Sequence, residues 1–379
     1  TLSIDPFDGF NIFGAYTWKR ADGETNAFVK PYQVYENGVS KGEFPTTGSS
    51  KSEQRTKTVT KQYNLQGTYE KNFHKNYLKA LVGFQSEELN YSYLLAGRKN
   101  YYYDGYEELV NGDISTASNS SSKYAWAMLS YFFRINYAYD DRYLLEVNGR
   151  YDGTSRFKKG HRWGFFPSVS AGWRISEENF FESAKSVVSN LKIRASYGLL
   201  GDDNVSGYAA FDYLDGYNYN KTGAVIDGEY YIGAEPRGLP VTNMSWIKAK
   251  LFDIGIDFGL FNNRLTGSFD FFNRKRTGLP APRYDVLIPD EAGFDLPKEN
   301  LNSDIHRGID GALTWNHHIG DLSYSIGGNF SYSRHLDWEQ YKPIFGNSWD
   351  QYRNSKYHRM NSISWGYEVI GQFQSWEEI

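Results

Sequence analysis

Residues 143–157 alternate between apolar and polar side chains, which is the pattern of a β-strand with a different environment on each face. One set is Tyr143, Leu145, Val147, Gly149 and Tyr151, and the opposite set is Leu144, Glu146, Asn148, Arg150 and Asp152. The opposite set carries both signs of charge, whereas the first set begins and ends in tyrosine. The pattern therefore predicts a strand with one face in water and the other against an apolar layer.

The same alternation recurs along the chain, most clearly in residues 124–139, 249–261 and 321–334. Turn-forming residues join such segments in pairs at 73–76, 140–141, 262–263 and 318–320. The other connections are rich in Tyr, Gly, Asn and Ser, and we predict long loops near 99–123, 201–247, 278–306 and 335–361. Only the connection at 158–163 is short on the long-loop side. We expect about twelve strands in all.

Tight turns at one rim and long loops at the other are typical of outer-membrane barrels. We therefore predict an all-β fold, a transmembrane antiparallel β-barrel, with residues 1–379 as one partial barrel domain. A large soluble sandwich or propeller is the alternative, because it also repeats short strands. The strand length and the lack of a second apolar stripe to pack against favour the barrel.

The amino-acid composition is consistent with a barrel wall in which only every second residue of a strand contacts lipid. Aromatic residues make up 18% of the 379 residues, yet the mean hydropathy is −0.63. No segment approaches the ~18–20 apolar residues of a membrane-spanning helix. Cysteine is absent, which excludes disulfides, thiolate metal sites and thiol nucleophiles. The net charge of −4 gives no basic footprint, so we expect no nucleic-acid partner.

Three sets of residues resemble the SusC/RagA family of TonB-dependent outer-membrane transporters. The most specific set runs from Asn148-Gly149-Arg150-Tyr151-Asp152-Gly153-Thr154-Ser155-Arg156-Phe157 through residues 166–176 (Phe-Pro-Ser-Val-Ser-Ala-Gly-Trp-Arg-Ile-Ser) to Glu178, Phe180 and Phe181. Thr154 stands where the family commonly has serine, which is a conservative difference. The second set is residues 191–198 with 201–204, and the third is residues 253–257, 263–265, 273–277, Pro289, 300–302 and 307–308.

The resemblance implies TonB-dependent active import of oligosaccharides or peptides across the outer membrane of a Gram-negative, Bacteroidetes-type bacterium. It also implies a plug domain inside a 22-stranded barrel, a SusD-like surface lipoprotein as a lid, and contact with TonB through an N-terminal segment. We expect this chain to be a middle-to-late barrel portion, with the plug and the TonB-contacting segment outside it. No covalent chemistry is implied, so we expect neither catalytic residues nor a cofactor. The alternative function is a non-transporting surface adhesin or glycan-binding β-protein.

Aromatic residues in the expected long loops are the candidate contacts for a ligand or a partner protein, because such rings stack on sugars and pack against proteins. They are Tyr101, Tyr102, Tyr103, Tyr213, Tyr217, Tyr219, Tyr230, Tyr231, Trp338 and Trp349, with Tyr341 and Tyr352 beside the last two. The alternative is that many of these rings only pack one loop against another.

Clustered carboxylates and histidines give weaker candidates. Asp202, Asp203 and Asn204 could supply oxygen ligands to calcium, but they lack a calcium-loop spacing and are ordinary turn residues, so we predict no metal site. His317 and His318 are adjacent on a strand and would point to opposite faces, which disfavours zinc. The pairs at 177–178 and 377–378 are the candidate acids for glycoside hydrolysis, and we expect neither pair to converge on one bond.

Overall fold

The computed structural model describes residues 1–379 except 104, 206–207, 209, 361, 374 and 377–379. The described residues contain seventeen strands, four 3₁₀ helices and one short α-helix. The strands are β1 (Leu2–Phe7), β2 (Phe10–Val29), β3 (Tyr32–Glu36), β4 (Val39–Phe44), β5 (Ser50–Phe73), β6 (Asn76–Lys99), β7 (Asp113–Tyr139), β8 (Tyr143–Thr154), β9 (Trp163–Arg174), β10 (Val188–Asp202), β11 (Tyr217–Ile226), β12 (Glu229–Pro236), β13 (Ile247–Leu260), β14 (Leu265–Ala281), β15 (Glu299–Ile319), β16 (Leu322–Glu339) and β17 (Arg359–Met360). The helices are η1 (Leu109–Asn111), η2 (Ile175–Glu177), η3 (Asn179–Ala184), η4 (Asp290–Ala292) and α1 (Ser348–Asn354).

Thirteen of these strands, over the described residues, are hydrogen-bonded in the order β1-β2-β5-β6-β7-β8-β9-β10-β13-β14-β15-β16-β17. Each pairing for which a register is given is antiparallel. Two hairpins, β3–β4 and β11–β12, form separate two-stranded sheets. An antiparallel all-β sheet was predicted from the sequence, and it is confirmed.

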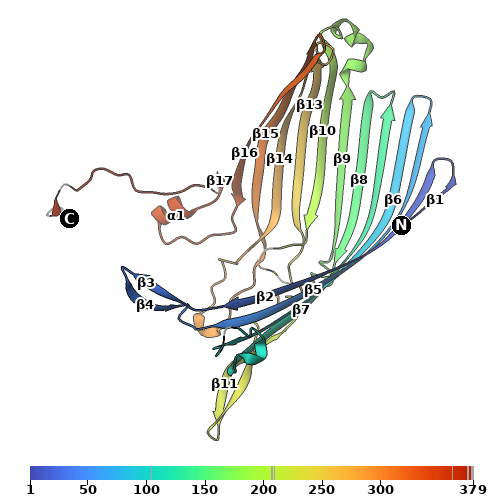
Figure 1. Cartoon of the computed structure of the whole chain (residues 1–379). Coiled ribbons are helices and arrows are strands. Elements are labelled where there is room, and N and C mark those ends of the chain that lie inside the picture. Colours follow the sequence, from blue (N-terminus) through green and yellow to red (C-terminus); the bar gives the residue numbers. More distant parts are fainter. Residues whose placement is uncertain (104, 206–207, 209, 361, 374, 377–379) are drawn as a thin grey trace. The chain divides into compact units, whose positions relative to one another are not determined.

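Contacts within the chain divide it into two compact units. The first comprises residues 1–69, 81–133 and 151–156, and the second comprises residues 70–80, 134–150 and 157–379. In the first unit, β2 pairs with β5 without a break in register from Phe10–Tyr69 to Val29–Ser50. In the second unit, β9, β10 and β13–β16 lie side by side (Figure 1).

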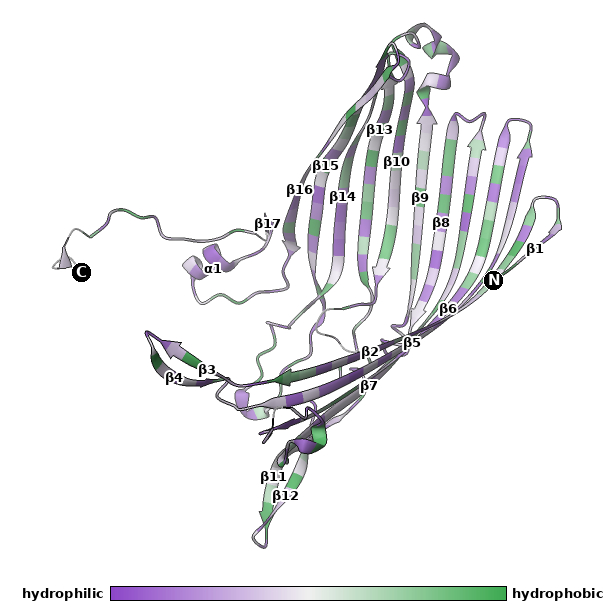
Figure 2. Cartoon of the chain, viewed as in Figure 1, coloured by the Kyte–Doolittle hydropathy of each residue, from purple (hydrophilic) through white to green (hydrophobic). Residues whose placement is uncertain are grey.

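The strands of the second unit have two different faces, which appear as alternating hydrophobic and hydrophilic bands in Figure 2. On β13, Phe252, Ile254 and Ile256 are each exposed to 41–42%, and they alternate with Asp253 and Asp257. The tyrosine-ended face of β8 is likewise open, with Tyr143 at 46% and Leu145 at 43%. Among the described residues, no protein layer covers these exposed apolar side chains, which is the arrangement of a wall that meets lipid.

Tight turns join the strands at one rim. In three of them, residues other than glycine take positive φ angles, namely His74, Asp140 with Asp141, and Phe261 with Asn262 and Asn263. Such conformations are tolerated best by Asn, Asp and Gly, which explains the turn residues at two of these positions. A fourth turn at Gly320, with φ 59°, joins β15 to β16.

The strands extend further into the expected loops than the sequence predicts. β7 begins at Asp113 inside the expected loop 99–123, β15 begins at Glu299 inside 278–306, and β16 continues to Glu339 inside 335–361. The expected loop 201–247 contains the β11–β12 hairpin, and residues 1–44 contain β1–β4, so the described residues have seventeen strands, thirteen of them in the main sheet, where about twelve strands were predicted. Residues such as 113–123 are polar on both faces, so they show no alternation although they are paired.

The 3₁₀ helices η2 and η3 lie between β9 and β10. Among the described residues, none of the helices is both long enough and apolar enough to cross a membrane.

Candidate functional site

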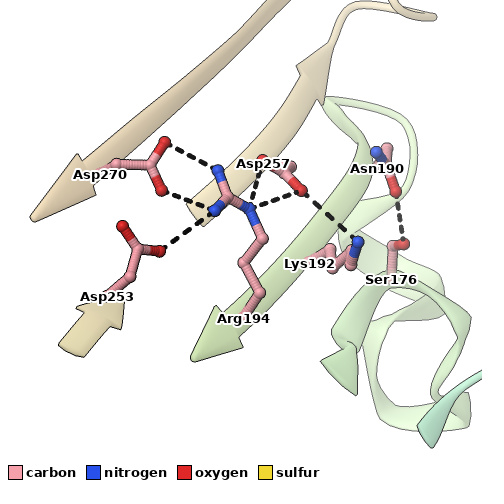
Figure 3. A network of polar contacts seen from close by, with 7 residues as sticks. All are labelled: Ser176, Asn190, Lys192, Arg194, Asp253, Asp257 and Asp270. Carbon is pink, nitrogen blue, oxygen red and sulfur yellow. Dashed lines mark hydrogen bonds and ion pairs between the residues drawn. The ribbon is translucent and has the colours of Figure 1, made fainter. Parts of the chain in front are cut away.

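The polar face of β10, β13 and β14 carries a network of charged side chains centred on Arg194 (Figure 3). The Arg194 guanidinium lies 2.7 Å from each carboxylate oxygen of Asp270, through Nη1 and Nη2. Its Nε donates to Asp257 at 3.2 Å, and its Nη1 donates to Asp253 at 3.4 Å. Lys192 Nζ lies 3.7 Å from Asp257, so two cations face three carboxylates.

Strand register and one glycine bring this network together. Gly255 pairs with Arg194 on one side and with Asp270 on the other. A Cβ atom at Gly255 would lie 2.1 Å from Asp270 Oδ1 and 2.9 Å from Arg194 Cζ, so only glycine leaves room for the ion pair. The motif at residues 253–257 therefore supplies two carboxylates and the gap between them.

A hollow of about 460 Å³ adjoins the network on the same polar face. Asn136, Glu146 and Ser170, from β7, β8 and β9, contribute to its lining together with Arg194. Glu146 accepts hydrogen bonds from Asn136 Nδ2 at 2.5 Å and from Asn148 Nδ2 at 2.7 Å. This face is therefore a hydrogen-bonding surface that suits contact with water and polar solutes.

A second cavity, of about 880 Å³, lies among the long loops of the second unit. Its lining includes Tyr208, Asp212, Arg237, Phe294 and Lys298. Arg237 Nη2 lies 3.5 Å from Asp212 Oδ1, so part of the charge is paired within the lining. The cavity thus offers both signs of charge and aromatic surface, which are the groups that bind sugars or peptides.

Aromatic packing fixes the loops around this cavity. The Trp246 ring lies 5.1 Å from that of Phe166 and 5.9 Å from that of Phe157, measured between centroids. Trp246 Nε1 donates to the carbonyl of Arg162 at 2.9 Å. Tyr208 packs on Phe157 at 5.9 Å, and burial raises the pKa of Tyr208 to about 12. Phe157 and Phe166, which the sequence marks as family-motif residues, therefore anchor the loops.

Two polar residues join the loops to one another. Asn300 Oδ1 accepts from Ser245 N at 2.8 Å, and Asn300 Nδ2 donates to the carbonyls of Ser245 at 3.1 Å and Gly278 at 2.6 Å. Asp285 accepts from Arg283, from Tyr341 Oη at 3.1 Å and from Lys342 Nζ at 3.0 Å. These hydrogen bonds, that of Arg283 foremost, hold the pKa of Asp285 well below its usual range.

The predicted aromatic contacts separate into exposed and packed residues. Tyr102 is 98% exposed and Tyr103 is 66% exposed, and the β11–β12 hairpin presents four more exposed tyrosines at Tyr217, Tyr219, Tyr230 and Tyr231. Trp349 is exposed on α1 and stacks on Tyr352 at 5.6 Å. These side chains are open to a ligand or partner, and their role stays a prediction.

Three predicted aromatic contacts are instead held by the protein. Tyr101 is 8% exposed and packs edge-on against Phe28 at 5.1 Å. Tyr213 Oη accepts a hydrogen bond from Arg162 Nη2 at 3.2 Å, which places Tyr213 among the anchored loops. Trp338 lies in β16 and stacks on His358 at 4.2 Å.

The candidate acids and metal ligands have structural contacts. Glu178 accepts from Tyr143 Oη at 2.6 Å and from Trp173 Nε1 at 3.0 Å, which lowers its pKa. Glu177 lies 3.6 Å from Arg174, while Glu377 and Glu378 lie outside the described residues. Asp202 accepts from Asn204 N at 2.8 Å, which is turn geometry. Within the described residues, no group of three or more metal-ligating side chains is present, and His317 packs between Trp315 and Tyr324.

Sequence analysis missed the Arg194 network and the charged residues of the loop cavity. The sequence did contain a signal for the network. The polar positions of neighbouring segments carry its charged residues, namely Lys192, Arg194, Asp253 and Asp257. Their meeting depends on strand register, which the alternation alone does not give.

A two-faced antiparallel sheet with tight turns at one rim and long anchored loops at the other defines the wall of an outer-membrane β-barrel. A family profile described as TonB dependent receptor-like, beta-barrel, matches residues 3–376. The chain therefore belongs to this family, which is one of transporters and not of enzymes. Its place is the outer membrane, as predicted.

The TonB-dependent receptor SusC of Bacteroides thetaiotaomicron is 32% identical over 287 residues, which cover 70% of this chain and 27% of that protein. The TonB-dependent receptor P3 of Formosa agariphila is 28% identical over 287 residues, covering 75% of this chain and 28% of that protein. The predicted resemblance to the SusC/RagA family is thus confirmed. The chain spans little more than a quarter of the length of these curated relatives.

Among solved structures, the RagAB peptide transporter has the same fold. It matches with a TM-score of 0.74 and 23% identity, over 90% of this chain and 36% of that chain. FpvA of P. aeruginosa, bound to a heterologous pyoverdine, matches with a TM-score of 0.52 and 13% identity, over 88% of this chain and 39% of that chain. The predicted barrel class is confirmed by these matches and by the family profile.

Proposed function

We propose that this chain forms a later part of the barrel of a TonB-dependent importer, which takes up oligosaccharides or peptides with a SusD-like lipoprotein as its lid. Residues 1–379 would then belong to one barrel domain. The observation that carries the proposal is the charged inner face of β10, β13 and β14, opposite a bare apolar face on the same strands. An adhesin that moves no solute has no need of such a wet inner wall.

The anchored loops favour entry of the solute from the long-loop side of the barrel. The loop cavity of about 880 Å³ has aromatic and charged groups in its lining, and such a site is large enough for a short oligomer. The exposed tyrosines of β11–β12 offer broad, rigid surface to a lid protein. The RagAB peptide transporter, which has the same fold, supports peptides as one of the two nutrient classes named here.

Uptake by intact cells tests the proposal. Cells that carry the full-length protein are given labelled oligosaccharides or labelled peptides, and uptake is compared with cells that lack this gene, the gene for the lid lipoprotein, or tonB. We expect one nutrient class to depend on all three genes. Uptake that continues unchanged without both TonB and the lid would contradict the proposal.

Substrate contact at the loop cavity is tested separately with the purified full-length protein. Replacing Arg237 and Lys298 by alanine removes the two cations of the lining, and we expect binding to weaken at least about 10-fold, since the loss of even one charged hydrogen bond costs about 1.5–3 kcal/mol. The matched control replaces the exposed Lys158 and Lys159 by alanine. Calorimetry that finds equal affinity for both variants would exclude this cavity as the binding site.

A further inference from the structure

Five cations lie on the apolar-facing side of β13–β16, at the ends of the strands that lead into the long loops. This cation patch consists of Lys248, Lys250, Lys275, Arg307 and Arg334. Strand register makes its members neighbours, because Lys250 pairs with Lys275 and Arg307 pairs with Arg334. Asn273, two residues before Lys275, pairs with Arg307 and so links the two rows.

The same face carries no charge over the next rows toward the tight turns. On β13 the outward positions after Lys250 are Phe252, Ile254, Ile256, Phe258 and Leu260. The facing positions of β14 are Phe271, Phe269, Gly267 and Leu265, and those of β15 are Ile309, Gly311, Leu313 and Trp315. On this outward face, the acid nearest to the patch by register is Glu339, which pairs with Ser303 at the ends of β15 and β16.

The patch is local to these four strands. β10 pairs with β13 and has Tyr197 opposite Phe252, Leu199 opposite Lys250 and Gly201 opposite Lys248. On β9, Val169 lies opposite Tyr197, so the outward row continues without charge. If every strand favoured cations at the height of the patch, β9 and β10 would also carry lysine or arginine at these outward positions. They carry uncharged residues there instead.

The patch cations differ from the inner cations in their partners. In the part of the chain that the structure describes, none of the five forms an ion pair, whereas Arg194 and Arg276 on the inner face both pair with aspartate. Lys275 Nζ lies 5.4 Å from the centroid of the Trp338 ring, and Arg334 Nε donates to Tyr332 Oη. These aromatic contacts orient the cations without neutralising them.

The patch lies at the height where lipid headgroups begin. The uncharged outward positions from Phe252 to Leu260 span about 26 Å at about 3.3 Å per residue. A strand tilt of about 40° reduces this height to about 20 Å, close to the ~25 Å apolar band of outer-membrane barrels. Long loops mark the outer side of such barrels, so the patch faces the outer leaflet.

We propose that the cation patch binds the phosphate groups of anionic lipid in the outer leaflet. Arginine forks and lysine ammonium groups are the side chains that bind phosphate, and a phosphomonoester carries more than one negative charge near neutral pH. Each lysine or arginine near an anionic surface adds to the attraction, so five neighbouring cations favour an anionic lipid over a neutral one. The barrel thereby holds a shell of phosphorylated lipid at β13–β16.

The full-length protein in lipid nanodiscs tests the site. Spin-labelled phosphatidic acid, a phosphomonoester, is compared with spin-labelled phosphatidylcholine for association with the protein. We expect wild-type protein to prefer phosphatidic acid, and K250Q/K275Q to lower that preference about 10-fold. The matched control K158Q/K159Q removes two lysines from an exposed loop and should leave the preference unchanged. Heat-modifiability on a gel verifies that each barrel is folded.

Two results would overturn the proposal. One is an equal preference for phosphatidic acid in K250Q/K275Q and in wild type. The other is a change of oligomeric state in the variant without a change in lipid preference, which would make the patch an interface between proteins. Should the variant fail to fold, wild-type protein in about 1 M salt gives the same test, because the screening length falls to about 3 Å and the preference should vanish.

Discussion

Asn300 joins two other backbone segments to its own with one side chain. Its amide can donate twice and accept through its carbonyl oxygen, and it uses all of this capacity on Ser245 and Gly278. No other small side chain carries a donor and an acceptor in that geometry. The family motif at residues 300–302 is thus explained by loop anchoring, since Asn302 also accepts from Tyr341 N at 2.9 Å.

We expect Asn300→Ala to destabilise the loops by about 2–4 kcal/mol, because three hydrogen bonds of about 1 kcal/mol each are lost and buried partners are left unsatisfied. Hydrogen–deuterium exchange at residues 243–247 and 278–281 measures the effect. Asn302→Ala is the matched control, which should cost about 1 kcal/mol because it removes one hydrogen bond. Equal exchange in the two variants would refute the anchoring role.

Asp285 gives the loops a dependence on pH. Its folded-state pKa is lowered by Arg283, Lys342 and Tyr341, so the contribution to stability is present above its unfolded pKa of about 4 and is lost as the pH falls through the lower folded value. We expect the contacts between loop residues 283–285 and 341–342 to persist below about pH 4. Limited digestion with pepsin should cut these loops in Asp285→Asn at a higher pH than in wild type. Identical pH profiles would show that Asp285 does not join the loops.

At the scale of the element, the two faces of β13 and β14 differ in whether they tolerate a charged side chain. Ile256 lies at the centre of the uncharged outward stretch, whereas Ser268 lies on the inner face opposite Asp257. The two positions are neighbours in the sheet. Substitutions at Ile256 and Ser268 therefore compare contact with lipid and contact with water at the same depth in the membrane.

We expect Ile256→Arg to destabilise the barrel by about 2–4 kcal/mol, which is the cost of arginine near the middle of the bilayer. Ser268→Arg should cost less than about 1 kcal/mol, because its guanidinium meets water and Asp257. Urea unfolding of the full-length protein in lipid vesicles compares the two. If Ser268→Arg is the more damaging change, the assignment of the faces is reversed.

The alternation of residues correctly predicted the strands that cross the apolar layer and the turns between them. It failed where strands continue into water, as at 113–123, because both faces there are polar and period-two contrast disappears. The hairpins β3–β4 and β11–β12 had a signal that was not used, since Asn37-Gly38 and Asp227-Gly228 have the residues and positive φ angles of two-residue hairpin turns.

The site was harder to predict than the fold. The tyrosine-rich loops were found from composition, but composition does not distinguish the buried Tyr101 from the exposed Tyr102. Arg194 and Asp270 are 76 residues apart in sequence, so their pairing follows only from the order and register of three strands. A single sequence gives the period of each strand and not its partners.

At the scale of the molecule, the β11–β12 hairpin is separable from the wall. Arg237 N donates to Gly216 O at 2.9 Å, so the chain already closes at the base of the hairpin. We expect replacement of residues 217–236 by a short glycine linker to leave barrel assembly intact and to reduce uptake and binding of the lid. Heat-modifiability and uptake assays measure the two effects. A barrel that no longer assembles would show that the hairpin is part of the wall.

The length of β15 has a consequence for what meets the cell. Its part from Arg307 to Glu299 lies beyond the apolar rows and is about 26 Å long at about 3.3 Å per residue, so at a strand tilt of about 40° it reaches about 20 Å further into the medium. The paired strand ends are therefore accessible to antibodies or phage fibres, which can bind them without contacting the bilayer. Surface labelling of living cells should modify a cysteine placed at Glu299 and spare one placed at Leu313.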